Sequence, residues 1–246
     1  MMTKHLTCTL PIKFYHLDAQ NRVSLPALIN LLFEASGKHA ELNGFGVEKT
    51  RELGFSWIVG RIGLDCRQML SQISQVHIET WIDRTIGPST LRKFRIKDDK
   101  GNLLATSCFT YAGLNLTTRQ PINVSEIIGD EIPDLEYGKG IRMPAKVRPA
   151  KTEMQEHASF QVQYGDLDYN QHATTTKYVQ WIMNAFPLEL HEGHYVQSLD
   201  INFSNELLYG DGVNSLIAQN AEKDYTIELQ TKGDVACRAR VTWFKA

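Results

Sequence analysis

The residues from Asp166 to His172, DLDYNQH, crowd two carboxylates, the amide of Asn170 and an imidazole into one short stretch. Carboxylates and imidazoles are side chains that transfer protons in enzymes. An apolar stretch with helical spacing follows at once. The first N–H groups of a helix lack intrahelical acceptors and can stabilise an oxyanion. This combination is typical of a hydrolytic site at the start of a buried helix.

The same residues also have a purely structural interpretation. Asp and Asn often satisfy turns and cap helices, so Asp168 and Asn170 alone do not identify a site. The sequence contains no motif that indicates a metal site or a serine nucleophile instead. The sequence HEGH, from His191 to His194, has the wrong spacing for a helical zinc motif, and we expect a loop there. No Gly-x-Ser-x-Gly elbow is present, which argues against a serine nucleophile.

The chain repeats itself. Leu17 and Asp18 match Leu167 and Asp168, KGNLLATSCFTY matches KGDVACRARVTW, and RQML from Arg67 matches NELL from Asn205. Three matches in one order indicate a duplicated unit. In this alignment the second unit has titratable residues where the first has none of the same type, with Arg22 opposite His172 and Gln68 opposite Glu206. We therefore expect one active site, in the second unit.

Each unit begins with a strand and a turn, continues with a helix and ends in further strands. The helices are predicted by the apolar sets Leu25, Leu28, Ile29, Leu32 and Phe33, and Tyr178, Trp181, Ile182, Ala185 and Phe186. Ser24 and Thr174 are the predicted N-caps. Strands are predicted over 7–15, 55–66, 75–82, 89–98 and 102–114, and over 159–164, 194–203, 212–221, 224–232 and 234–244. One long helix against antiparallel strands, twice, is an α+β fold.

The composition sets further bounds. A net charge of -2 disfavours a nucleic-acid binder, and no apolar run is long enough to insert stably in a membrane. The four scattered cysteines, which we expect to be buried, and the lack of a signal peptide favour the cytoplasm. We divide the chain into units 1–128 and 155–246, joined by a linker at 129–154. Its basic residues are expected to be solvated or to meet an acidic partner.

The tandem units and the DLDYNQH segment resemble the acyl-ACP thioesterases of plants and bacteria. The family pattern D-L-D-x-N-x-H-x-N-N-x-x-Y is matched at Asp166, Leu167, Asp168, Asn170, His172 and Tyr178. The resemblance covers nearly the whole chain and implies two tandem hotdog units. Two departures from the pattern involve three positions. Thr174 and Thr175 replace the paired Asn, and Leu207 stands where plant members have a Cys, so a Cys nucleophile cannot carry over.

The resemblance implies hydrolysis of acyl-ACP that ends chain elongation, with no metal or organic cofactor. Asp168, Asn170, His172 and Glu206 form the implied catalytic set, and either Glu206 or His172 would activate water. Thr174, Thr175, Phe55, Trp57 and Met69 are the candidate substrate-binding residues, although large apolar residues are usually plain core.

The implied partner is an acyl carrier protein, which is acidic in this family. Either the linker or the group Arg92, Lys93 and Arg95 would receive it. An acyl-CoA thioesterase and a non-catalytic acyl-binding scaffold are the alternatives, and both a monomer and a homodimer are compatible with the sequence.

Overall fold

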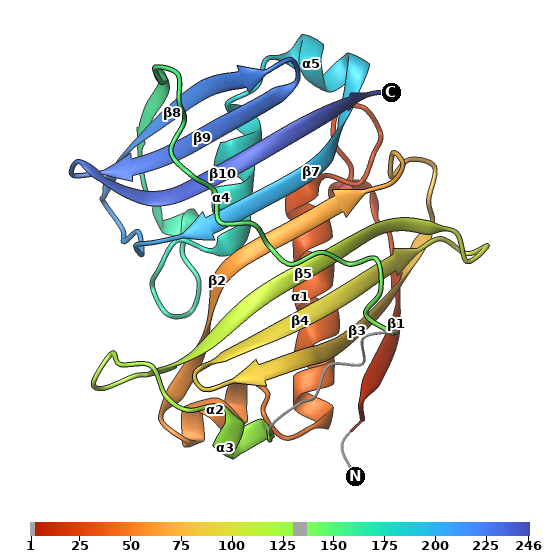
Figure 1. The fold of residues 1–246 in the computed structure, drawn as a ribbon, viewed down its shortest axis with the longest axis vertical. Helices are drawn as coiled ribbons and strands as arrows, with labels where there is room; N and C mark the ends of the chain where they lie inside the picture. Colours follow the sequence, from red (N-terminus) through yellow and green to blue (C-terminus); the bar gives the residue numbers. More distant parts are fainter. Residues whose placement is uncertain (1–2, 130–136) are drawn as a thin grey trace.

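Ten strands form one antiparallel sheet in the computed structural model, which describes residues 3–129 and 137–246. Their order across the sheet is β1-β3-β4-β5-β2-β7-β10-β9-β8-β6 (Figure 1). The strands of the first half are β1 (His5–Pro11), β2 (Phe55–Cys66), β3 (Gln75–Ile86), β4 (Ser89–Lys97) and β5 (Leu103–Asn115). Those of the second half are β6 (Gln155–Gln161), β7 (His194–Phe203), β8 (Gly212–Ala221), β9 (Asp224–Thr231) and β10 (Asp234–Lys245).

Two helices, α1 (Leu25–Leu42) and α4 (Thr175–Asn184), lie behind the sheet in Figure 1, one in each half. The short helices are α2 (Val47–Glu52), α3 (Ser125–Ile128) and α5 (Leu188–Gly193). Ser24 and Thr174 are the N-caps of α1 and α4, as predicted, but only the Ser24 hydroxyl accepts a hydrogen bond, from the Ala27 N–H. This arrangement confirms the α+β prediction. No helix among the described residues is long and apolar enough to cross a membrane.

Four local predictions are wrong. The strand predicted over 159–164 lies at Gln155–Gln161 instead. The first strand ends at Pro11 rather than continuing to Tyr15, because proline cannot donate to the strand ladder. Helix α4 ends at Asn184, so Ala185 and Phe186 are buried beyond it. Pro187 limits the helix there, since the residue before a proline avoids helical geometry. HEGH is not a loop but the end of α5 and the first residue of β7.

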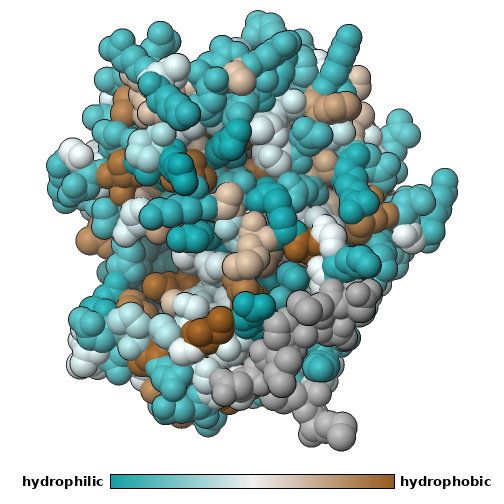
Figure 2. Space-filling model, viewed as in Figure 1, coloured by the Kyte–Doolittle hydropathy of each residue, from teal (hydrophilic) through white to brown (hydrophobic). Residues whose placement is uncertain are grey.

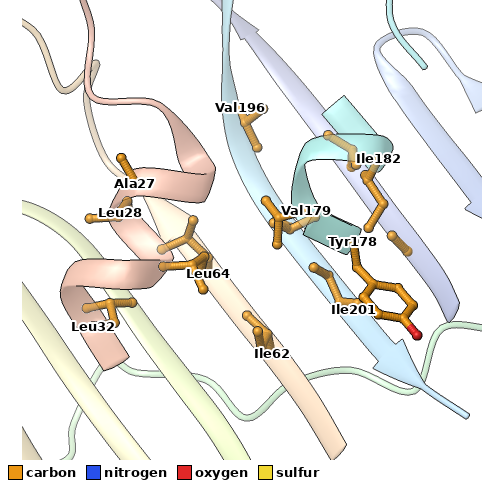
Figure 3. Close-up of a cluster of buried hydrophobic side chains, with 14 of the residues drawn as sticks. Ala27, Leu28, Leu32, Ile62, Leu64, Tyr178, Val179, Ile182, Val196 and Ile201 are labelled. Carbon is orange, nitrogen blue, oxygen red and sulfur yellow. The ribbon is translucent and has the colours of Figure 1, made fainter. Parts of the chain in front are cut away.

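The pairing of β2 with β7 joins the two halves. Its register places Ile62 opposite Ile201 and Leu64 opposite Leu199, and all four side chains are fully buried. Residues of α1 and α4 pack over these strands (Figure 3). One continuous hydrophobic core therefore extends across both halves. All four cysteines are buried and unpaired, as predicted.

Residues 141–147, which we call the crossing segment, run over the sheet on the face opposite α1 (green in Figure 1). Ile141 and Val147 are buried. Of the basic residues of the linker, Lys146, Arg148 and Lys151 are exposed, as expected, whereas Arg142 is half-buried. The Arg142 guanidinium pairs with Asp65 on β2 at 2.8 Å and with Asp200 on β7 at 2.6 Å. The rest of this face is largely hydrophilic (Figure 2).

The crossing segment also explains a glycine. A Cβ at Gly63 on β2 would lie 3.0 Å from the Pro144 Cα, so a side chain there would require the crossing segment to shift. The predicted boundaries at 128 and 155 stay a prediction. The last helix before the linker ends at Ile128, and the first strand after it begins at Gln155.

We predict that Arg142→Leu lowers the free energy of unfolding by about 1–3 kcal/mol, because it leaves the carboxylate of Asp200 without its charged partner. The measurement is the urea midpoint of unfolding. Arg148→Leu, at an exposed position of the same stretch, is the matched control. Equal midpoints for the two variants would contradict the prediction.

Candidate active site

The turn that carries the polar motif is folded by Asp168. Its Oδ1 accepts the Asn170 N–H at 2.8 Å and the His172 N–H at 3.2 Å. Gln171 occupies the left-handed region with a φ of 65°, which closes the turn. Asp168 therefore acts on His172 through the backbone. The Asn170 side chain has no hydrogen bond to another described residue and lines a pocket, where its amide can meet a ligand.

Glu206 comes to His172 through a second segment that follows β7. The Ala173 N–H donates to the Leu207 carbonyl at 2.8 Å, and the Tyr178 hydroxyl donates to the Asn205 carbonyl at 3.3 Å. These bonds hold His172 Nε2 3.2 Å from Glu206 Oε2. A half-buried imidazole thus lies in direct contact with a carboxylate at the start of α4.

Arg119 completes this group from the first half of the chain. Its guanidinium donates to Glu206 Oε2, the same oxygen that faces His172. Arg119 lies in the loop after β5, more than eighty positions before Glu206. Sequence reasoning missed it, since the two residues meet only through the packing of one half against the other and no motif marks the position.

A pocket of about 600 Å³ opens beside these residues. Its walls come from both halves, with α1, β2 and β5 on one side and the motif of the second half on the other. Asp168, Asn170, His172, Glu206, Thr174, Thr175 and Trp57 all line it. The acyl-binding candidates Phe55 and Met69 do not. Phe55 is fully buried against Trp57, and Met69 lines a separate, smaller pocket.

The inner part of the pocket is polar. Ser36, Thr90, Arg92 and Tyr111 line it in the first half, together with apolar side chains such as Phe33 and Ile82. Arg92 is only 4% exposed, so its proposed place on a surface that receives the carrier protein is wrong. The alternation of side chains along β4 turns Arg92 inward with Thr90 and Phe94.

Lys93 and Arg95 face the other side of β4 and are already paired. Lys93 Nζ lies 3.1 Å from Asp83 Oδ1, and Arg95 Nη1 lies 3.4 Å from Glu79 Oε2. Both side chains are largely buried. Together with the pairing of Arg142, these contacts leave less free basic charge on this face than the sequence indicates.

His39 supports Arg92 from α1. The Arg92 Nη1 donates to His39 Nδ1 at 3.1 Å, so the proton of the neutral imidazole lies on Nε2, which donates to the Thr3 carbonyl at 2.9 Å. Burial and the neighbouring Arg92 charge lower the pKa of His39 to about 4. His39 therefore contributes no positive charge at neutral pH.

The first half contains the counterpart of the polar turn. Asp18 Oδ1 accepts the Gln20 and Arg22 N–H groups at 2.8 and 3.0 Å, as Asp168 does in the second half. Arg22 stands in the place of His172 and pairs with Asp18 at 3.0 Å. The pocket beside it measures only about 120 Å³.

The structure corrects one residue of the repeat alignment. Arg22 bridges to Ser71 and His172 bridges to Leu208, so Met69, and not Gln68, is the counterpart of Glu206. The Leu70 and Leu207 carbonyls accept equivalent N–H groups, from Val23 and Ala173. The first half therefore lacks both the imidazole and the carboxylate at these two places.

Solved structures with the same architecture are thioesterases of the hotdog fold. An acyl-ACP thioesterase from Bacteroides thetaiotaomicron is 24% identical, with a TM-score of 0.86 over 98% of each chain. The 12:0-ACP thioesterase from Umbellularia californica is 23% identical, with a TM-score of 0.80 over 98% of each chain. At this level of identity, these likenesses show that the chain has the same fold.

The family itself follows from the sequence. The model of the acyl-ACP thioesterase N-terminal domain matches residues 4–132, and that of the C-terminal domain matches residues 149–245. The chain belongs to the acyl-ACP thioesterase family. The oleoyl-acyl carrier protein thioesterase of Coriandrum sativum is 23% identical over 92% of this chain, which spans 66% of that relative's length.

We predict that the stability contributed by a neutral His39 is lost as the pH falls. The folded pKa of about 4 lies below the ordinary value of 6.5, so the unfolded chain takes up the proton first. The free energy of unfolding should therefore decrease between pH 6.5 and pH 4, by up to about 3 kcal/mol from this group.

Urea unfolding at several pH values measures this effect. His39→Gln should flatten the pH dependence in that window, whereas His157→Gln, at an exposed position, should leave it as in the wild type. Parallel curves for His39→Gln and the wild type would show that His39 does not carry the effect.

Proposed function

We propose that this protein hydrolyses acyl-ACP and releases the free fatty acid. The observation that carries the proposal is the contact of His172 Nε2 with Glu206 Oε2 at 3.2 Å, at the edge of a pocket of about 600 Å³. The family membership supports the carrier-linked substrate. Release in the cytoplasm would end elongation of the chain in fatty acid biosynthesis.

In this proposal the pair of His172 and Glu206 takes a proton from a water molecule. The water oxygen attacks the thioester carbonyl carbon, and the carbonyl oxygen becomes an oxyanion. The first N–H groups of α4, which have no intrahelical acceptors, lie next to the motif and would stabilise that charge. The carbon–sulfur bond then breaks, and the proton held by the pair passes to the departing thiolate.

Each remaining residue of the motif has a separate task. The free amide of Asn170 lines the pocket and would orient the water or the thioester. Asp168 is a positioning residue, because its carboxylate bonds the backbone of the turn. Leu207 is fully buried and has no nucleophilic atom, so we propose direct attack by water.

The acyl chain would extend into the first half of the protein. Trp57, Phe33 and Ala40 line the pocket beyond the motif, and they supply apolar surface for a hydrocarbon chain. Thr174 and Thr175 line the same pocket at the start of α4. Their shorter side chains replace the amides of the family pattern and would leave more room beside the thioester.

We predict that His172→Ala and Glu206→Ala each lower kcat/KM for acyl-ACP by about 10²–10⁴-fold, the range typical of a lost proton-transfer group. The measurement is thiol release from a panel of acyl-ACP and acyl-CoA substrates. Asn170→Ala should also lose activity. Gln20→Ala, its counterpart in the first half, is the matched control and should retain it.

The panel separates the possible outcomes. Preference for CoA-linked substrates would replace the proposal with acyl-CoA hydrolysis on the same fold. A folded wild type that is inactive on every substrate would refute hydrolysis and favour an acyl-binding scaffold.

A further inference from the structure

The inner end of the large pocket contains a buried positive charge that the proposed hydrolysis does not use. Arg92 lines the pocket and is only 4% exposed. Its Nη1 donates to His39 Nδ1 at 3.1 Å and to Thr80 Oγ1 at 3.3 Å. Both acceptors are neutral, because His39 is deprotonated at neutral pH.

No carboxylate of residues 3–129 or 137–246 lies within ion-pair distance of Arg92. A guanidinium has five N–H donors. The bonds to His39 and Thr80 use only Nη1, so the donors of Nε and Nη2 have no acceptor within the described part of the chain. Burial lowers the pKa of Arg92 to about 10, which still leaves it charged at pH 7. An unpaired buried charge is costly, and an anion would compensate it.

Neighbouring polar side chains extend this site. Thr90 lies two residues before Arg92 on the inward face of β4, and the Tyr111 hydroxyl lies 3.4 Å from Ser36 Oγ. All of these residues line the pocket with Arg92. A purely hydrocarbon chain end would leave the Nε and Nη2 donors of Arg92 without an acceptor, whereas an oxygen-bearing group would satisfy them.

The site is distant from the thioester. The pocket passes from Phe203 at the end of β7, across β2 and β5, to Arg92 on β4. Neighbouring strands lie about 4.8 Å apart, so three such steps separate β7 from β4 by about 14 Å. An acyl chain whose thioester lies beside His172 would therefore reach Arg92 with its far end and not with the carbons next to the thioester.

We propose that Arg92 binds a carboxylate at the far end of the acyl chain, so that ω-carboxyacyl chains are preferred to ω-methyl chains of the same length. This inference rests on the proposed hydrolysis of acyl thioesters and adds the substrate class. The Thr90 and Tyr111 hydroxyls would donate further hydrogen bonds to that carboxylate, which only accepts.

The test compares ω-carboxyacyl-ACP with ω-methyl acyl-ACP in a series of increasing length. At the length that reaches Arg92, wild-type kcat/KM should be at least about tenfold higher for the carboxylated chain. Arg92→Met should reverse the preference. Lys97→Met, on the outward face of the same strand, is the matched control and should keep it.

A binding measurement makes the test independent of hydrolysis. A free dicarboxylic acid should raise the Tm of the wild type more than the monocarboxylic acid of equal length, and Arg92→Met should abolish the difference. Arg92→Lys, which keeps the charge but loses the planar fork, should retain part of it if Arg92→Met does not fold. The comparison of the two acids on the wild type requires no variant.

The outcomes are distinct. Equal kcat/KM for the ω-carboxyacyl and ω-methyl chains, together with equal Tm shifts for the two free acids, would overturn this inference and leave the proposed function intact. Arg92 would then serve only to hold His39 and the N-terminal segment. An Arg92-dependent Tm shift in a protein that hydrolyses no acyl-ACP would refute the proposed function and support the binding site.

Discussion

The antiparallel pairing of β2 with β7 is the constraint on which the rest of the structure depends. It converts two similar halves into one ten-stranded sheet and places α1 and α4 over a shared core. It also brings Arg119 to Glu206 and extends the walls of the large pocket across both halves. The crossing segment reinforces the same junction, since Arg142 contacts a carboxylate on each of the two strands.

Most of the fold could be predicted because its signals are local. Alternating side chains and turn residues gave β2, β7 and β8 with the observed bounds, and helical spacing with a polar cap gave the starts of α1 and α4. The polar turn could be predicted for the same reason, since Asp168, Asn170 and His172 lie within five residues. Errors occurred where proline limits an element, at Pro11 and near Pro187.

The rest of the site depends on contacts between distant segments. Arg119 and Glu206 approach each other only through the tertiary structure. The sequence predicts Arg92 at the surface, because a charged side chain on a strand usually faces water. The sequence does not show that β4 presents it inward to His39. The repeat alignment places Gln68 opposite Glu206, one position away from the structural counterpart, Met69. These segments are loops joined by isolated bridges, so no strand pairing fixes their alignment.

The two polar turns show what duplication followed by divergence permits. Asp18 and Asp168 fold the same turn, so that part of the motif belongs to the fold. In a symmetric pair of identical subunits, every substitution occurs twice, and each site must keep both its chemistry and its acyl pocket. Here one half supplies the imidazole and carboxylate and the other supplies the deep end of the pocket. Under the proposed function, evolution or engineering can therefore alter which chain end is recognised through residues of the first half, while the proposed catalytic residues of the second half stay unchanged.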